Sequence, residues 1–470
     1  MFGGNERDQV ALLTGPGVNS ILGAALAPLG LELVTSRVHS VHHRPGAGVT
    51  VGYTAVVRGL AGIRGTEYLC ATTAHLKRPD APGLVRVDTG VTPVYVWRHP
   101  GDPELPALAV ACTPSLLSAR LGEQVSTRMV AYRPTRRAVV KVSYADGSGA
   151  FAKVLRPGHS HSLAERHRML TAAGVPSPRV LRDDPDGLVL LTVGPGRPLS
   201  NLLAGGMSSN DASDMFMRIT ELLDALPSEA LTLPTHPAWS ERVHHYAHAA
   251  STVLPAYAGR INAIADGVAE LMADSDPGPV VPVHGDFYKA NVFTEGTEIS
   301  SLLDVDSLGP GHRVDDYACL LGHMSVLDHL APGTYKRLRP ILDEWTRQAG
   351  RQVDPVSLWA RAAGVVLSLV SGARREGNAP WRADAEGRLV MADALARAIT
   401  EEPDAVLDVA TLTGAQIVAL GDHVAAVMGT PDLREEVVAA AQRAGESFWP
   451  MPLPAHLRAT LDSPFADLRN

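Results

Sequence analysis

The sequence predicts an α+β protein in which a small β-rich lobe precedes a larger helical lobe. Residues 125–155 alternate with the period of strands on both sides of the turn Asp146-Gly147-Ser148-Gly149, which indicates a β-hairpin. Residues 205–275 and 315–400 are rich in Ala and Leu and contain few helix breakers, so they are expected to be mostly helical. The Gly/Pro-rich stretch "GPGRPLS" between the two parts is expected to connect them as a hinge.

Composition limits the classes of function. The 470 residues suggest roughly two to four domains. The formal net charge of −8 argues against general nucleic-acid binding, which needs a basic surface. We find no apolar run near the ~20 residues of a membrane span, and the N-terminus lacks the pattern of a secretory signal. The three cysteines are far apart and show neither disulfide nor metal spacing, so we expect a cytoplasmic protein.

Residues 1–120 form an N-terminal extension with a weak internal repeat. "HRPGAGVTVGYTAVV" (43–57) resembles "YRPTRRAVVKVSYAD" (132–146), since both place Arg-Pro three residues before a β run. "GTEYLCATT" (65–73) then falls where the later copy has "GAFAKVLRP", but it carries no lysine. Two interpretations stay open: a degenerate copy of the later hairpin, or an ordinary hairpin that happens to follow Arg-Pro.

Residues 121–195 are expected to form the β-rich lobe. Its hairpin ends at Pro157-Gly158, and "SHSLAERHRMLTAAG" has helical periodicity and stops at Gly174. "VPSPRVL" and "GLVLLTV" then predict two more short strands. Lys153 lies on the second hairpin strand, and Glu165 follows twelve residues later on the helix.

The helical lobe, residues 196–382, contains "VHGDFYKANV" at 283–292. Phosphoryl transfer needs a base for the attacking hydroxyl, oxygen ligands for magnesium and a cation on the nucleotide phosphates. In protein kinases the base and one metal ligand come from a loop with Asp, four intervening residues and Asn. Asp286 and Asn291 have this spacing, and Asp304, thirteen residues further on, is expected to bind metal from the next short hairpin.

The order of a strand lysine and a helix glutamate predicts an ion pair between Lys153 and Glu165 that aims the lysine at the phosphates. Lys141 is a rival, but no helix directly follows its strand. The chain has no G-x-G-x-x-G motif. The equivalent loop is "YRPTRR", where Arg133, Arg136 or Arg137 could contact phosphate.

Each residue also has a structural interpretation, since Asp286 and Asn291 could simply stabilise their own turn. We expect His284 to hold the loop by hydrogen bonds. Asp306 is either a second metal contact or a residue that fixes the loop, and we favour the latter. The residue types occur together in the required order, which favours a phosphotransferase. A non-catalytic pseudokinase is the alternative for this part of the chain.

The motifs "VHGDFYKANVF", "LLDVDSLGPGHRVDDYA" and "ERHRMLTAAGVPSPRVL" resemble the aminoglycoside phosphotransferase/choline kinase-like family over about residues 120–382. The resemblance implies a bilobal protein-kinase-like fold, ATP or GTP as donor, Mg²⁺, and a small-molecule hydroxyl as acceptor. Asp316 matches a later family Asp, which we interpret as a structural residue at a helix start. Residues 205–275 lack the dense acidic clusters expected for a polycationic drug, so drug resistance does not follow.

After Trp381, "WRADAEGRLVMADALARAITEEPDAVLDVATLTGAQIVALG" resembles the leucyl (cytosol) aminopeptidase family, whose signature is NTDAEGRL. The resemblance implies a partial α/β segment at 383–470, with Asp384 and Glu386 as ligands of a two-metal site and Arg388 as a catalytic residue. We find no upstream GKG…FDTGG-type stretch, and Arg382 and Ala383 replace the signature's Asn-Thr. We therefore expect an incomplete centre with plain helix-flank carboxylates. Mn²⁺ or Zn²⁺ would be needed only if the segment is functional.

Overall fold

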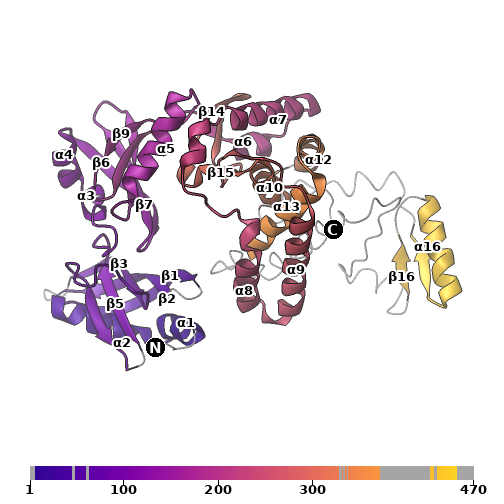
Figure 1. Cartoon of the computed structure of the whole chain (residues 1–470). Coiled ribbons are helices and arrows are strands. Elements are labelled where there is room, and N and C mark those ends of the chain that lie inside the picture. The colour runs from indigo at the N-terminus through magenta and orange to yellow at the C-terminus, as the bar shows by residue number, and fades with distance from the viewer. Residues whose placement is uncertain are drawn as a thin grey trace.

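Figure 1 shows a computed structural model of the chain. The structure describes residues 6–44, 48–59, 63–90, 92–327, 331, 334–335, 337–370, 424–427 and 431–451.

The N-terminal domain is a five-stranded antiparallel sheet with two helices packed against it. Its sheet has the order β1-β2-β3-β5-β4. Buried apolar side chains of the second helix and of the central strands form its core. The elements are α1 (Glu6–Thr14), α2 (Val18–Leu26), η1 (Ala27–Leu29), β1 (Glu32–Arg44), β2 (Gly48–Arg58), β3 (Arg64–Thr72), β4 (Val85–Asp88) and β5 (Pro93–Arg98).

The following β-rich lobe, here called the N-lobe, is a second five-stranded antiparallel sheet, with the order β6-β7-β8-β10-β9. Its core also includes residues 105–117, upstream of the expected boundary at 121. The elements are α3 (Leu108–Cys112), α4 (Pro114–Leu121), β6 (Val125–Arg133), β7 (Arg137–Tyr144), β8 (Gly149–Leu155), α5 (Ser160–Ala172), β9 (Val180–Asp183) and β10 (Leu188–Thr192).

The two sheets share their strand order and their hairpin register. Arg44 pairs with Gly48 in the first hairpin, and Arg133 pairs with Arg137 in the second, so both hairpins enclose loops of equal length. The third strands of the two sheets differ at one matched position. Lys153 is opposite Val139 in the second sheet, whereas Thr72 is opposite Thr50 in the first. The hydroxyls of Thr50 and Thr72 lie 2.7 Å apart in a buried hydrogen bond. The internal duplication stays a prediction, and these shared features support it.

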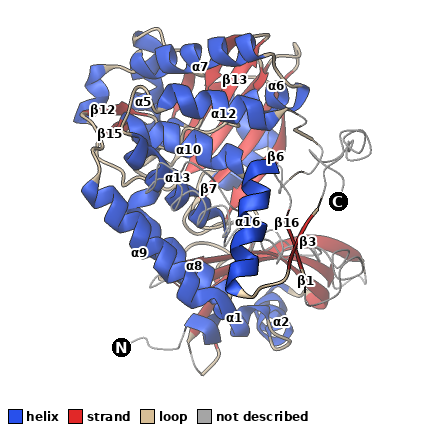
Figure 2. Ribbon diagram, turned by 90° about the vertical axis from the view of Figure 1, so that its right-hand side faces the viewer, coloured by secondary structure: helices blue, strands red, loops and turns tan. Residues whose placement is uncertain are grey.

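The helical lobe, here called the C-lobe, packs its helices around two small antiparallel sheets, β11-β13-β14 and β12-β15. Figure 2 shows α6, α7 and α12 at the end opposite the N-terminal sheet, whereas α8 and α9 extend toward it. A large apolar core joins helices α5 to α7, α10, α12 and α13, and a second joins α8, α9 and α13. The helices are α6 (Leu199–Gly205), α7 (Ser209–Asp224), α8 (Val243–Val253), α9 (Ala258–Asp274), α10 (Arg313–Ser325), α12 (Leu338–Ala349) and α13 (Pro355–Val370).

The remaining C-lobe elements are short. They are the strands β11 (Arg197–Pro198), β12 (Val280–Val283), β13 (Val292–Glu295), β14 (Glu298–Leu302) and β15 (Gly309–His312), and the 3-10 helices η2 (Ser228–Thr232), η3 (Ser240–Arg242), η4 (Pro255–Tyr257) and η5 (Val305–Ser307). The bilobal α+β architecture expected from the sequence is confirmed.

The described part of the C-terminal segment is a parallel β-α-β unit. It comprises β16 (Ala425–Val427), α16 (Pro431–Ala444) and β17 (Phe448–Pro450), with Ala425 paired to Phe448. A parallel pair joined by a helix is the unit from which α/β sheets are built, which agrees with the partial α/β segment expected here. Asp384, Glu386 and Arg388 lie outside the described residues.

In the described part of the chain, no single helix has the length and apolar composition needed to cross a membrane. A bent pair, Asp8–Thr14 with Val18–Leu29, meets the length and composition test across a 62° break. Val18, Ile21 and Leu22 of this pair are buried in the core of the N-terminal domain.

Candidate active site

The loop 284–291, between β12 and β13, is held by a buried carboxylate on α10. Asp316 is fully buried in the first turn of that helix, and its two oxygens accept the backbone N–H groups of His284 and Gly285, at 2.9 Å each. Gly285 has φ +78°, and a Cβ there would lie 2.9 Å from Ser307, so the turn requires glycine. The expected structural position of Asp316 at the helix start is confirmed.

Side chains of the loop complete its fixation. His284 is fully buried, and its Nε2 lies 2.8 Å from the carbonyl oxygen of Leu303. Asn291 Nδ2 donates a hydrogen bond to the carbonyl oxygen of Asp286 at 3.0 Å. His284 therefore has the loop-holding role predicted from the sequence, and Asp286 and Asn291 belong to one rigid turn.

The carboxylate of Asp286 is partly enclosed. Trp239 Nε1 donates to its Oδ1 at 3.2 Å, and the Trp239 ring stacks on Tyr246 with centroids 5.6 Å apart. Burial raises the pKa of Asp286, and the charge of Asp304 adds to this effect, while His284 and the Trp239 bond oppose it. One carboxylate oxygen is therefore occupied by an indole, and the group binds a proton more readily than an ordinary aspartate.

Lys153 on β8 reaches across the lobes to two aspartates of the C-lobe. Its Nζ lies 2.9 Å from Asp304 Oδ1 and 2.9 Å from Asp306 Oδ2. Burial by itself lowers the pKa of Lys153, but the two carboxylates outweigh it and raise the pKa above its usual value. Burial likewise disfavours the charged form of Asp304, but Lys153 and Arg137 hold the pKa of Asp304 far below its usual value. Lys153 and Asp304 are therefore both charged at neutral pH.

The predicted ion pair between Lys153 and Glu165 does not form in this structure, because the helix turns Glu165 outward. Glu165 Oε1 lies 3.2 Å from His161 Nε2, and its side chain is 53% exposed. The inward face of α5 carries Leu163, Ala164, His167 and Leu170 among its buried residues. Residues two positions apart on a helix point to opposite sides, so the apolar spacing could have shown that His167, rather than Glu165, faces the cleft.

His167 is the α5 side chain beside Lys153. Its Nδ1 lies 2.9 Å from Ser177 Oγ. Burial and the charge of Lys153 lower the pKa of His167 to about 3. Its imidazole is therefore neutral near pH 7 and adds no charge to the cleft.

A cavity of about 530 Å³ lies between the lobes, which is within the ~300–1,000 Å³ range of small-molecule sites. Its polar lining includes Arg133, Arg137, Lys153, Asn291 and Asp304, and Asp304 lies within 3.6 Å of both Arg137 and Lys153. The rest of the wall is mainly apolar and includes Ala138, Val139, Phe151, Leu155, Leu191, Val193, Phe293 and Leu303. An apolar slot that ends in opposite charges suits a ligand with an aromatic part and a charged part.

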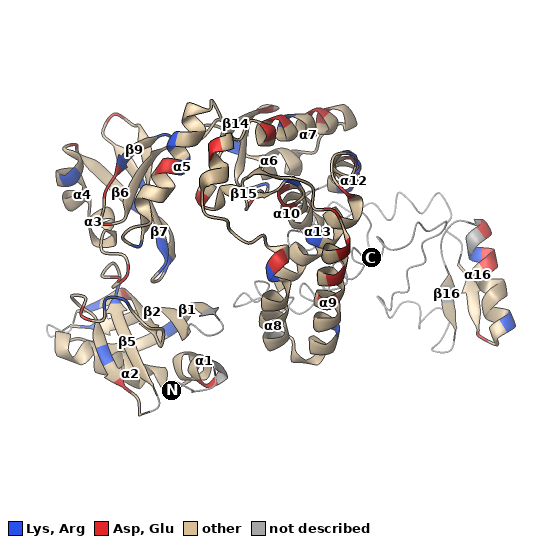
Figure 3. Cartoon of the chain, viewed as in Figure 1, with Lys and Arg blue, Asp and Glu red and all other residues tan. Residues whose placement is uncertain are grey.

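Arg137 Nη1 lies 3.6 Å from Asp304 Oδ1, so this arginine of the "YRPTRR" loop reaches the same charged group as Lys153. Figure 3 shows basic residues on β7, the strand that carries Arg137. Sequence reasoning named Arg137 only as one of three loop arginines, and it did not identify Trp239 or His167. Trp239 belongs to no recognisable sequence motif. It lies 47 residues from Asp286 in the sequence and contacts it only in the folded chain.

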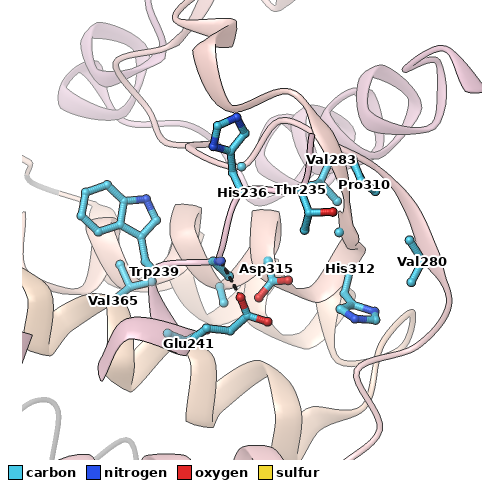
Figure 4. A pocket seen from close by; sticks show the side chains of 15 residues that line it. Thr235, His236, Trp239, Glu241, Val280, Val283, Pro310, His312, Asp315 and Val365 are labelled. Carbon is cyan, nitrogen blue, oxygen red and sulfur yellow. Dashed lines mark hydrogen bonds between the residues drawn. The ribbon is translucent and has the colours of Figure 1, made fainter. Parts of the chain in front are cut away.

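A second, smaller cavity of about 160 Å³ lies behind the loop, beside Gly285. Figure 4 shows that Trp239, Glu241, His312 and Asp315 line it, and Glu241 Oε2 accepts the N–H of Ala238 at 2.9 Å. Asp315 forms a buried ion pair with Arg361. The two acidic side chains that line this smaller cavity, Glu241 and Asp315, thus already have partners within the chain.

Asn291 and Asp304 both line the larger cavity and offer oxygen ligands, the type that magnesium prefers. Among the described residues, no group of three or more His, Cys, Asp or Glu side chains is placed to hold a metal ion. Magnesium commonly uses one or two protein ligands together with phosphates and waters. The chemistry of Asn291 and Asp304 therefore fits a nucleotide-bound magnesium.

Residues 134–352 match the family described as "Phosphotransferase enzyme family". The central region of this chain resembles a phosphotransferase. This match lies within the range of about 120–382 expected from the sequence. Residues 363–470 match a second family, described as "Cytosol aminopeptidase family, catalytic domain". Both resemblances expected from the sequence are confirmed. The second match begins inside α13, upstream of residue 383.

The aminopeptidase-like region is similar to several probable cytosol aminopeptidases. A probable cytosol aminopeptidase of Micrococcus luteus (strain ATCC 4698) is 66% identical over 87 residues, which are 18% of this chain and 17% of that protein. A probable cytosol aminopeptidase of Streptomyces avermitilis is 53% identical over 112 residues, 24% of this chain and 21% of that protein. The chain therefore spans only about a fifth of the length of these relatives.

Solved structures similar to this chain include three phosphotransferases. An aminoglycoside phosphotransferase in complex with ADP and hygromycin B has a TM-score of 0.44 at 15% identity, covering 62% of this chain and 99% of that one. A macrolide 2'-phosphotransferase from Brachybacterium faecium has a TM-score of 0.36 at 19% sequence identity, and the match covers 58% of this chain and 96% of that one. A choline/ethanolamine kinase family protein from Mesorhizobium loti has a TM-score of 0.40 at 18% sequence identity, and the match covers 62% of this chain and 92% of that one.

We predict that Asp316→Asn will loosen the 284–291 loop. An amide offers one acceptor oxygen where the carboxylate accepts two N–H groups, so at least one buried N–H loses its partner, at a cost of about 1–3 kcal/mol. Urea unfolding followed by circular dichroism measures this loss. Asp343→Asn is the control, because Asp343 pairs with Arg339 on the exposed face of α12. Equal stability of the two variants would contradict this role of Asp316.

We predict a pH-dependent effect of Lys289→Met. Burial lowers the pKa of Lys289 to about 8, although the ammonium lies 5.7 Å from the Tyr288 ring centre. The unfolded chain keeps the usual value of 10.5, so between these pH values it binds more protons than the folded chain, and stability rises with pH. The variant should exceed the wild type in stability most clearly below pH 8.

Urea unfolding at a series of pH values from 7 to 10.5 tests this prediction. The difference between Lys289→Met and the wild type should shrink as the pH rises. Lys77→Met replaces an exposed lysine of the N-terminal domain and serves as the control. A difference for Lys289→Met that stays constant over this range, or grows with pH, would contradict the prediction.

Proposed function

We propose that the protein is a small-molecule kinase that moves the γ-phosphoryl group of ATP or GTP to a hydroxyl of a small molecule. One observation carries the proposal: Lys153, Asn291 and Asp304 line a single cavity, and Asn291 is hydrogen-bonded to the loop residue Asp286. The resemblance of residues 134–352 to phosphotransferases supports the reaction class. The nucleotide and a small acceptor are then the partners, and the cytoplasm is the proposed location.

In the proposed reaction the acceptor oxygen attacks the γ-phosphorus and forms a new P–O bond, while the bond to the β,γ-bridging oxygen breaks and the nucleoside diphosphate leaves. Asp286 accepts the proton of the acceptor hydroxyl. Its raised pKa suits this role, and the Trp239 bond to Oδ1 leaves Oδ2 for the substrate.

Lys153 holds the nucleotide phosphates, and it exchanges its contact with Asp304 for phosphate oxygens. Asn291 and Asp304 would hold Mg²⁺, which would neutralise phosphate charge. Asp306 keeps its contact with Lys153 and fixes the loop, as favoured from the sequence. Glu165 has no direct part in this arrangement, because it is exposed and paired with His161.

We predict that Asp286→Ala will reduce phosphoryl transfer by roughly 10²–10⁴-fold, the usual effect of losing a general base. Binding of Mg²⁺-ATP should stay within a few-fold of the wild type, since Asp286 does not line the nucleotide cavity. ATP consumption with a panel of amino-alcohol, sugar and antibiotic acceptors gives the rate, and calorimetry gives the affinity. Normal turnover of the variant would remove Asp286 from the mechanism.

Glu165→Gln is the matched comparison, because it removes a carboxylate from α5, the helix beside the cleft. The structure places this group in solvent, so the variant should keep wild-type activity. A large loss of activity would instead favour the Lys153–Glu165 pair expected from the sequence. Failure of the wild type to bind Mg²⁺-ATP would favour a non-catalytic pseudokinase.

Aminopeptidase activity is the second candidate, favoured by the 66% identity to a probable cytosol aminopeptidase over 87 residues. Asp384, Glu386 and Arg388 would then act in a metal site with Mn²⁺ or Zn²⁺. We consider it the weaker proposal, because the upstream lysine and aspartates of that family's site are missing from the sequence. Hydrolysis of a leucine anilide that is lost in Asp384→Ala would establish it.

A further inference from the structure

The loop between β6 and β7 has an unusual apex. Its residue Thr135 is 6% exposed and has φ +60°, in the left-handed region that favours glycine. Among the described residues, Thr135 and Asp304 are the two non-glycine residues with positive φ, and Asp304 lines the cleft. Such conformations persist only where the surroundings enforce them. Something must therefore hold Thr135 in place.

The groups that hold it come partly from outside the N-lobe. Asp102 Oδ2 accepts the backbone N–H of Thr135 at 2.7 Å, and Arg156 Nε donates to the Thr135 carbonyl oxygen at 2.6 Å. Glu104 Oε2 lies 3.6 Å from Arg156 Nε. We call Asp102, Glu104 and Arg156 the Thr135 brace. Both backbone polar groups of the strained residue are thus bonded by charged side chains.

The brace is anchored in the N-terminal domain. Asp102 and Glu104 are 4% and 3% exposed and lie on the segment that joins β5 to α3. Glu104 Oε1 accepts the N–H of Lys77 at 2.7 Å, and Asp102 Oδ1 accepts the N–H of Glu104 at 2.9 Å.

Tyr132 extends this link toward the cleft. Its hydroxyl donates to Asp102 Oδ2 at 2.7 Å and accepts from Trp97 Nε1 of β5 at 3.1 Å. Tyr132 and its neighbour Arg133 both line the large cavity. The bonds therefore run without interruption from the N-terminal sheet to the wall of the cleft.

The braced loop presents two arginines to the charged end of the cleft. Arg133 and Arg137 flank Thr135, line the large cavity, and are the first pair of the β6–β7 hairpin. Arg137 lies 3.6 Å from Asp304 across the cleft. The loop has no glycine-rich sequence to wrap phosphates with its backbone, so any phosphate contact falls to its arginines, whose positions depend on how the apex is held.

We propose that Asp102 is a positioning residue for the nucleotide phosphates, and that the N-terminal domain thereby sets the shape of the phosphate-binding hairpin. This inference rests on the proposed kinase function. It gives residues 1–105 a role in substrate binding, although none of them is named in a phosphotransfer motif. Asp102 acts through Thr135 and the flanking arginines, and it makes no contact with substrate itself.

The test compares two ligands on the full-length chain by calorimetry. Mg²⁺-ATP has the phosphates that the hairpin would contact, whereas adenosine has none. Asp102→Ala should weaken Mg²⁺-ATP binding by about 10-fold or more, the effect of losing one good polar contact, and leave adenosine binding within about 3-fold. A purely structural role would weaken both ligands alike, and that outcome would overturn the proposal, as would unchanged affinity for both.

Controls separate this proposal from the kinase function itself. Glu67→Gln removes another carboxylate of the N-terminal domain. Glu67 Oε1 lies 2.6 Å from Arg98 Nη2 and is not part of the Thr135 brace, so this variant should bind both ligands like the wild type. If Asp102→Ala does not fold, the same titrations on Asp102→Asn decide by the same rule, because one amide oxygen replaces the acceptors of three donors. A wild type that does not bind Mg²⁺-ATP would refute the kinase function and not the brace alone.

Discussion

The contact of Lys153 with Asp304 and Asp306 is the interaction on which the two-lobed site depends. It joins β8 of one lobe to the end of β14 in the other, across 151 and 153 residues of sequence. Lys153 and Asp304 are partly buried opposite charges, and each offsets the cost of removing the other from water. The same contact holds the cleft residues in register, so a nucleotide would enter a site whose cation and metal ligands are already close together.

Both loops at the site are irregular, and each is fixed by a buried carboxylate on a neighbouring element. Asp316 on α10 binds the N–H groups at the start of the 284–291 loop, and Asp102 binds the N–H of Thr135 at the apex of the β6–β7 hairpin. Loop N–H groups cannot be satisfied by a strand or helix ladder. A buried carboxyl group that accepts these N–H groups fixes the backbone and thereby places the neighbouring side chains of Asp286 and Arg137.

The junction between the two family resemblances lies inside a packed helix. The aminopeptidase-like match starts at residue 363, within α13 (Pro355–Val370). Yet Ala363, Val366 and Leu367 are buried in a core shared with α8 and α9 of the C-lobe. Whatever the origin of this sequence, its first turns complete the helical lobe. The apolar face of α13 was sufficient for that, since packing requires volume and pattern rather than ancestry.

The sequence by itself determined the order of the parts: the hairpin strand with Lys153, the loop with Asp286 and Asn291, and Asp304 after it. Local spacing fixes such features, because each depends on residues that are neighbours along the chain. The apolar spacing of α5 also indicates that His167 turns inward, but this signal was overlooked, and the expected pairing of Glu165 with Lys153 does not form in the structure. Only the tertiary structure brought Trp239 to Asp286 and Asp102 to Thr135. These contacts join segments whose separation in sequence carries no periodic signal. The first forms only when the C-lobe has folded, and the second only when the N-terminal domain packs against the N-lobe.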